Sequence, residues 1–207
     1  MKTDRMLAPV DTIGEAIDPA LEPRRWTTRR AFGMGLFGLA LPPLAGCMTK
    51  PLEPVRADGS YCHRTGKRYR PTLTCTVEPV PSLDVEAQAK MFEANRGALT
   101  LYVVRKRWGD VRNQVVTSFD GRRRVTTIPE SLIRVRLKPG EHRLALEWEG
   151  SLSEFVVSGA AGEVRFVELV GSVWSWGSSY RWENGSLHSS LDRAISSRLI
   201  ADLDMTG

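Results

Sequence analysis

The sequence predicts a mainly β domain, built as an antiparallel sandwich or open barrel with helices only at its two ends. Between residues 99 and 173, short runs of alternating or apolar residues are separated by glycine, proline and aspartate turns. Apolar residues recur at helical spacing only before residue 96 and after residue 188. Strands and helices do not alternate along the chain, so the pattern excludes a parallel α/β nucleotide-binding fold.

A short helix is predicted over residues 84–95, where Ser82 or Asp84 can cap the first turn. Its apolar residues return every three or four positions, as one face of a helix requires. From residue 99 to residue 104 the period changes to two, which predicts a strand.

The dipeptide Asp120-Gly121 marks the next predicted hairpin. It separates residues 114–119 from an arginine-rich return strand at 122–128, and Asp-Gly is among the strongest short-range signals for a tight hairpin. A further hairpin is predicted to join residues 133–137 to 142–148, because pairing Leu137 with His142 places all their apolar residues on one face.

Two more strands are predicted at residues 154–158 and 163–173, around a Gly/Ala turn. The second is apolar on both faces, which is typical of a central strand. A terminal helix is predicted from Ser189 onward, because leucine and isoleucine recur every four residues as far as Leu203.

An aromatic hairpin precedes this helix and is a candidate binding surface. Its aromatic residues flank a Gly-Ser-Ser turn and are Trp174, Trp176, Tyr180 and Trp182. Aromatic faces bury much area at low entropic cost, so they suit a sugar or a protein partner. The alternative is that the four rings cover one end of the core.

Two basic runs and one histidine complete the candidate site residues. Arg105, Lys106 and Arg107, with the arginines at 122–124, could form a basic face for an anionic glycan or lipid. The alternative is a charged edge that blocks strand addition. His142 could act as a base or ligand, which a hydrolase would require, but the sequence places no acid and nucleophile beside it. The alternative is hydrogen bonding to backbone carbonyls near the turn.

Residues 1–46 are predicted to be a cleaved export and lipidation signal. Arg29 and Arg30 precede an uncharged run that ends in Leu-Ala-Gly-Cys47, and the run is too short and too interrupted by proline to span a bilayer comfortably. This region resembles a twin-arginine signal followed by a bacterial lipobox, which implies a diacylglycerol on Cys47. Because Met48 is not the aspartate that commonly retains lipoproteins on the inner membrane, an outer-membrane location facing the periplasm is expected.

The remaining cysteines are predicted to form a disulfide. Cys62 and Cys75 are an even pair in an oxidising compartment. A metal site that adds His63 is the alternative, but adjacent cysteine and histidine rarely point at one ion.

The proline-rich residues 47–81 are predicted to be a lipid-anchored tether that carries this disulfide, and residues 82–207 are predicted to form the β domain. The net charge of +5 is too small to indicate nucleic-acid binding, and the predicted export also makes nucleic acid a poor partner.

Several motifs resemble those of a family of small bacterial envelope lipoproteins with a domain of unknown function. They are A-K-x-F at 89–92, Y-V-x-R at 102–105, D-G at 120–121, P-G-x-H at 139–142 and G-x-x-x-F-V at 162–167. The resemblance covers about residues 87–170. It implies an immunoglobulin-like or transthyretin-like sandwich and supplies no catalytic residue.

The expected function is therefore that of a non-enzymatic envelope lipoprotein, which acts as a structural or protein-interaction module at the membrane. No cofactor or metal is expected beyond the lipid on Cys47. The alternative is a protein that binds a cell-wall saccharide or peptidoglycan through the Trp174 to Trp182 hairpin. The sequence contains no G-x-S-x-G, H-E-x-x-H or phosphate-loop motif that would favour an enzyme.

Overall fold

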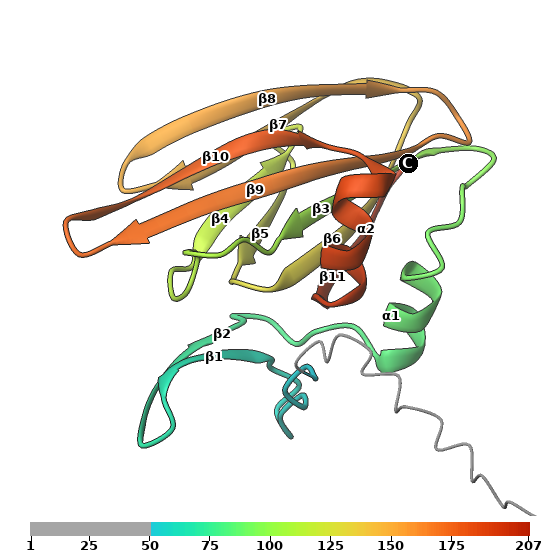
Figure 1. The fold of residues 1–207 in the computed structure, drawn as a ribbon. Helices are drawn as coiled ribbons and strands as arrows, with labels where there is room; N and C mark the ends of the chain where they lie inside the picture. Colours follow the sequence, from blue (N-terminus) through green and yellow to red (C-terminus); the bar gives the residue numbers. More distant parts are fainter. Residues whose placement is uncertain (1–50) are drawn as a thin grey trace, which may run out of the picture. The chain divides into compact units, whose positions relative to one another are not determined.

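The computed structural model describes residues 51–207, and the predicted signal and Cys47 lie outside this range. The elements of the described part form three sheets and two helices (Figure 1). In chain order they are β1 (Cys62–Lys67), β2 (Arg70–Cys75), α1 (Leu83–Ala89), β3 (Leu99–Arg105), β4 (Val115–Phe119), β5 (Arg123–Thr127), β6 (Ser131–Leu137), β7 (Gly140–Trp148), β8 (Ser151–Gly159), β9 (Val164–Trp174), β10 (Gly177–Gly185), α2 (Leu187–Ile195) and β11 (Arg198–Met205). The mainly β class is confirmed.

The larger sheet is mixed, so the prediction of a wholly antiparallel fold is wrong. Its strand order is β10-β9-β3-β6-β11, and the pairs β3–β9 and β6–β11 are parallel. Parallel pairs need long connections, which here pass through the four-stranded sheet or through α2. Strand β9 lies inside the sheet between β10 and β3, which confirms that it is a central strand.

The second sheet is antiparallel, with the order β5-β4-β7-β8. The predicted Asp-Gly hairpin is present as β4 and β5. Asp120 and Gly121 both have positive φ, at 50° and 65°, as a primed turn requires. The amide of Arg122 donates to the carbonyl of Phe119 at 3.0 Å.

The predicted hairpin between residues 133–137 and 142–148 is wrong. Leu137 pairs with Leu99 of β3, whereas His142 pairs with Val157 of β8, so the turn at Pro139 carries the chain from one sheet to the other. Alternation correctly gave the buried face of each strand, because both strands contribute to one core. It could not show that the two strands lie in different sheets.

One hydrophobic core lies between the faces of these two sheets. It combines side chains from both, among them Leu101, Val103, Ile133 and Val135 from the five-stranded sheet and Phe119, Leu144 and Leu146 from the four-stranded sheet. Burying each such side chain stabilises the fold by about 1.5–3 kcal/mol relative to leaving it exposed.

A second apolar cluster covers the opposite face of the five-stranded sheet. Ala89 of α1 and Ala194 of α2 pack there against Tyr102 and Phe166, whose ring centroids lie 5.3 Å apart. This explains why every residue of β3 is buried. Helix α1 begins at the Ser82 cap, as predicted, but ends at Ala89 instead of residue 95.

The predicted terminal helix is too long. Helix α2 begins after a capping box between Ser186 and Ser189 and ends at Ile195, while Leu199 and Leu203 lie on β11. A spacing of four residues fits one face of a helix and equally one face of a strand. A bulge at Ile200 then reverses the alternation, so Leu199 faces the helices and Leu203 faces the main core.

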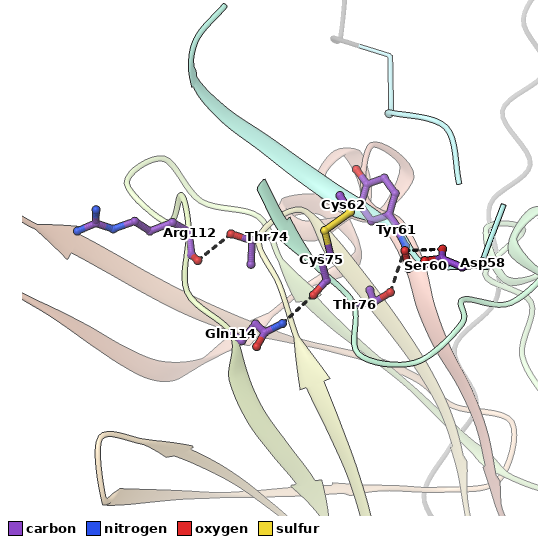
Figure 2. Close-up of a disulfide and its surroundings, with 9 residues drawn as sticks. All are labelled: Asp58, Ser60, Tyr61, Cys62, Thr74, Cys75, Thr76, Arg112 and Gln114. Atoms are coloured by element: carbon purple, nitrogen blue, oxygen red, sulfur yellow. Dashed lines mark hydrogen bonds between the residues drawn. A yellow bond between two sulfur atoms is a disulfide. The ribbon is translucent and has the colours of Figure 1, made fainter. Parts of the chain in front are cut away.

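The described part of the predicted tether is folded against the domain. A disulfide joins Cys62 to Cys75 at the open end of the β1–β2 hairpin, which confirms the predicted pairing and leaves no thiolate there for a metal (Figure 2). The Thr74 hydroxyl donates to the carbonyl of Arg112 at 2.7 Å, and the Gln114 amide donates to the carbonyl of Cys75 at 2.7 Å. Within residues 51–207, no helix has the length and apolarity needed to cross a bilayer.

Candidate functional site

A groove that contains two exposed tryptophans is the candidate functional site, and we call it the tryptophan groove. Its volume is about 690 Å³, within the range of sites that bind small molecules or short segments of a partner. The residues that line it come from β1, the loop at 106–113, the turn before β6, the end of β9 and α2. Among them are His63, Arg64, Lys106, Trp108, Glu130 and Trp174.

The loop at 106–113 is held by a buried ion pair. The Arg105 guanidinium donates to both carboxylate oxygens of Asp110, at 2.7 and 2.8 Å, and each side chain is only 1% exposed. Arg105 also donates to the carbonyl of Thr127 at 2.7 Å, and its guanidinium carbon lies 5.0 Å from the centroid of the Tyr180 ring. Because Arg105 directs its hydrogen bonds to Asp110 of the loop and to Thr127 beside it, the loop has a defined path.

Trp108 projects from this fixed loop and is 91% exposed. The amide of Val173 donates to the carbonyl of Gly109 at 3.1 Å, so the loop lies directly beside the end of β9. Trp174, the last residue of β9, is 50% exposed and lines the same groove. Its ring stacks on Trp176, which is 82% exposed, with centroids 5.5 Å apart and planes nearly parallel.

Charged side chains form the other walls of the groove. Glu130 lies 3.4 Å from His63 Nδ1 and 3.4 Å from Lys106 Nζ. Hydrogen bonding to His63, together with the positive charge of Lys106, outweighs the effect of burial and lowers the pKa of Glu130 to about 2. Glu130 is therefore a carboxylate at neutral and mildly acidic pH.

A second buried carboxylate fixes the arginines at the rim. Glu168 on β9 is 2% exposed and accepts a hydrogen bond from Arg107 Nε at 2.8 Å. It also accepts from the hydroxyl of Ser190, at 2.7 Å, and from the guanidinium of Arg193, both on α2. Arg107 and Arg193 therefore hold definite positions at the groove, but much of their charge is already compensated.

The structure divides the predicted aromatic hairpin into two halves. Trp174 and Trp176 are exposed at its tip, whereas Trp182 is 8% exposed and belongs to the main core. Trp182 donates its indole N–H to the carbonyl of Ser153 at 3.3 Å. Tyr180 is partly buried against the same core, and burial raises its pKa. Only the tip pair is placed to contact a partner.

The other predicted site residues do not join the groove as one basic face. Arg105 is buried, so its charge is not available at the surface. Arg107 lies at the groove, paired with Glu168 and Glu183. The exposed arginines at 122–124 lie in the turn between β4 and β5 and at the start of β5, and none of them lines the groove.

His142 lies in the other sheet and is held by two hydrogen-bonding contacts. Its Nδ1 is 2.7 Å from Asp120 Oδ2, and its Nε2 is 2.7 Å from the carbonyl of Lys138. The contact with Lys138 agrees with the predicted alternative of bonding to a turn carbonyl. Burial opposes ionisation of Asp120, but the hydrogen bond with His142 and the amide of Arg143 lower its pKa. These contacts join the β4–β5 turn to the start of β7.

Sequence reasoning missed two groove residues, Trp108 and Glu130, and named His63 only in an alternative metal site. Trp108 stands in an Arg-Trp-Gly-Asp run, and a tryptophan among turn-forming polar residues was a signal of an exposed aromatic. Glu130 and His63 carry no comparable signal, because they are far apart in sequence and meet only when β1 packs beside the turn before β6. In the described part of the chain, no three His, Cys, Asp or Glu side chains gather as a metal site would require.

Comparison with known proteins does not assign the chain to a family. No family model matches it, and no curated protein matches it.

Proposed function

We propose that this chain is a non-enzymatic interaction module of the bacterial cell envelope, which binds another envelope protein through the tryptophan groove. The observation that carries the proposal is the nearly complete exposure of Trp108 on a loop fixed by the Arg105–Asp110 pair. Tryptophan is strongly enriched among the residues that contribute most to protein interfaces. Holding it in place before binding reduces the entropy lost on association.

The surroundings of Trp108 support a protein partner. Protein interfaces combine a central aromatic or aliphatic anchor with a polar rim, and the groove has this composition. Trp108 and Trp174 supply the apolar area, while Arg64, Lys106 and Glu130 supply charged groups around it. Such charges give orientation and specificity more than affinity.

The envelope location is proposed from the sequence. The lipobox-like run ending at Cys47 and the twin-arginine-like motif support export and attachment to the outer membrane. The Cys62–Cys75 disulfide agrees with an oxidising compartment such as the periplasm. We also propose that the two larger sheets form a sandwich of the immunoglobulin-like or transthyretin-like kind, which their shared core supports and which the parallel pairs modify.

The proposal is tested by crosslinking in living cells. A photoreactive amino acid is placed at Val111, which lines the groove, or at Leu152, an exposed apolar residue of β8 used as the control. We expect a covalent adduct with an envelope protein from position 111 and none from position 152. Trp108→Ala should abolish the adduct, whereas Leu187→Ala, which removes another exposed apolar side chain, should leave it. Equal adducts from both positions, or an adduct insensitive to Trp108→Ala, would contradict the proposal.

A saccharide or peptidoglycan ligand is the second candidate, favoured by the parallel, exposed rings of Trp174 and Trp176. Sugar rings stack on such exposed aromatic faces. A titration with soluble peptidoglycan fragments should then change the tryptophan fluorescence, and Trp174→Ala should remove the change while Leu152→Ala keeps it. If no change occurs in the unmodified protein, the saccharide candidate is excluded and the protein partner is not affected.

A further inference from the structure

The β1–β2 hairpin carries a basic surface that shares only Arg64 with the tryptophan groove. Its members are Arg64, Lys67, Arg68 and Arg70, and all four side chains are exposed. The sequence contains no aspartate or glutamate between Asp58 and Glu78, so the hairpin has only positive charges. We call these four residues the basic hairpin surface.

Within residues 51–207, the lack of ion pairs distinguishes the basic hairpin surface from most other basic residues. Arg107, Arg134 and Arg198 each contact a carboxylate at hydrogen-bond distance. No side chain of the basic hairpin surface forms an ion pair with an acid in residues 51–207. The one side-chain bond among the four is from the Arg64 guanidinium to the carbonyl of Arg68, at 3.2 Å, which leaves the charge uncompensated.

Two apolar side chains accompany these charges. Tyr69, between Arg68 and Arg70, is 74% exposed, and Leu73 on β2 is 48% exposed. The Lys67 ammonium lies 5.7 Å from the centroid of the Tyr69 ring. Tyrosine beside lysine and arginine is the combination that settles at the headgroup level of a bilayer, where the ring is partly buried and the cations meet phosphate.

The hairpin is also held in a fixed shape. The disulfide closes its open end, and hydrogen bonds from Thr74 and Gln114 attach β2 to the 112–114 segment of the domain (Figure 2). The charged tip is therefore presented by a rigid base, which reduces the entropy lost when the tip is ordered at a surface.

We propose that the basic hairpin surface binds the headgroups of anionic phospholipids, with Tyr69 entering the interface. Apart from Arg64, this contact uses no residue of the tryptophan groove, and it does not require a lipid on Cys47. It orients the domain on the membrane by a second point of attachment.

The test measures partition of the full chain, carrying Cys47→Ser so that no lipid can be attached there, onto vesicles. Mixed phosphatidylglycerol and phosphatidylcholine vesicles are compared with pure phosphatidylcholine. In the triple variant Lys67→Ser, Arg68→Ser, Arg70→Ser, we expect the part of the partition that depends on phosphatidylglycerol to fall roughly 100-fold, since each basic residue near an anionic surface contributes about fivefold. Raised salt should weaken the binding of the unmodified protein to the phosphatidylglycerol-containing vesicles in the same way.

The matched control is the triple variant Arg122→Ser, Arg123→Ser, Lys138→Ser. It also removes two arginines and one lysine, all exposed and none paired with an acid of the described chain. They lie near one another, because His142 contacts both Asp120 and the carbonyl of Lys138. The phosphatidylglycerol-dependent partition of the control variant should fall less than about threefold, as expected for charges outside the contact. Equal losses in the two variants would overturn the proposal in favour of general electrostatic attraction.

Hydrogen exchange gives a local readout that does not depend on how the rest of the chain meets the vesicle. Mixed vesicles should protect the peptide covering residues 64–73, and pure phosphatidylcholine should not. Circular dichroism of the hairpin variant should match that of the unmodified chain, since all three substituted side chains are exposed. Absence of protection at 64–73, or equal protection by both kinds of vesicle, would overturn the proposal.

Discussion

Arg105 and Asp110 form a buried ion pair that joins the end of β3 to the loop carrying Trp108. Two hydrogen bonds, of 2.7 and 2.8 Å, link the guanidinium to the carboxylate, and both side chains are 1% exposed. The pair thus lies between the core of the domain and its most exposed tryptophan. It couples the stability of the fold to the geometry of the tryptophan groove.

Removing one member of this pair should destabilise the protein strongly. Asp110→Ala leaves the Arg105 charge buried without a partner, and we expect a loss of about 3–5 kcal/mol in the free energy of unfolding. Urea denaturation measures it. The control is Glu154→Ala, which breaks the exposed pair with Arg143 and should cost no more than about 1 kcal/mol. Similar losses in the two variants would show that the buried pair has no special role.

Gly171 should be intolerant of a methyl group. An added Cβ would lie 2.5 Å from Tyr180 Cε1 and 2.7 Å from Asp110 Cγ, so β9 or the Arg105–Asp110 pair would have to shift. We expect Gly171→Ala to cost about 1–3 kcal/mol in thermal or urea unfolding. Gly97→Ala is the control, because its nearest neighbour, Asn95 Oδ1, lies 3.7 Å away. A neutral Gly171→Ala would mean that the strand has more room than these distances show.

Glu130 should make stability depend on pH in the acid range. Its pKa is lowered from 4.5 to about 2, mainly by hydrogen bonding to His63. As the pH falls, Glu130 therefore takes up a proton in the unfolded chain before it does so in the folded protein. The stabilisation that ionised Glu130 provides is complete above pH 4.5 and is lost as the pH falls toward about 2. The difference in unfolding free energy between the unmodified protein and Glu130→Gln should shrink over this window. A difference that is constant with pH would contradict the assignment.

Reduction of the disulfide should destabilise the region that holds the hairpin. Closing a loop of this length stabilises a protein by roughly 3 kcal/mol in the chain-entropy model. Cys62→Ser with Cys75→Ser should therefore unfold at lower urea concentration than the unmodified protein. Reductant should reproduce the shift in the unmodified protein and have no effect on the variant. If the two proteins unfold together, the contacts of Thr74 and Gln114 are sufficient to hold the hairpin.

Cys47→Ala tests the proposed anchor. The substitution should abolish metabolic labelling of the protein by a fatty acid, because the sulfur that accepts the lipid is absent. It should also reduce the membrane-bound fraction, although the basic hairpin surface would leave some binding to anionic lipid. Cys62→Ser with Cys75→Ser serves as the control and should remain labelled. Unchanged labelling after Cys47→Ala would exclude the proposed lipidation site.

Local signals in the sequence predicted the strands well. The Asp120-Gly121 turn, the apolar strand around Val167 and the Ser82 cap all appear in the structure, because each depends on residues close together in the chain. The disulfide was predictable because Cys62 and Cys75 remained as the only pair once Cys47 was assigned to the predicted lipid anchor.

Strand pairing was less predictable. Alternation assigns Val135 and Leu144 to a buried face, but it does not say that one belongs to the five-stranded sheet and the other to the four-stranded sheet. The same limit applies to Leu199 and Leu203, whose spacing suits a helix as well as a strand. Long-range hydrogen bonding decided between these possibilities.

By itself, the sequence determined the mainly β class, the disulfide and most of the segments that form strands, since turn chemistry and hydrophobic period are local properties. Only the tertiary structure decided which aromatic residues face solvent, placing Trp182 in the core and Trp108 and Trp174 at the groove. It also decided that Arg105 is buried and that His63 meets Glu130. These outcomes depend on contacts between distant segments, whose energies no local pattern records.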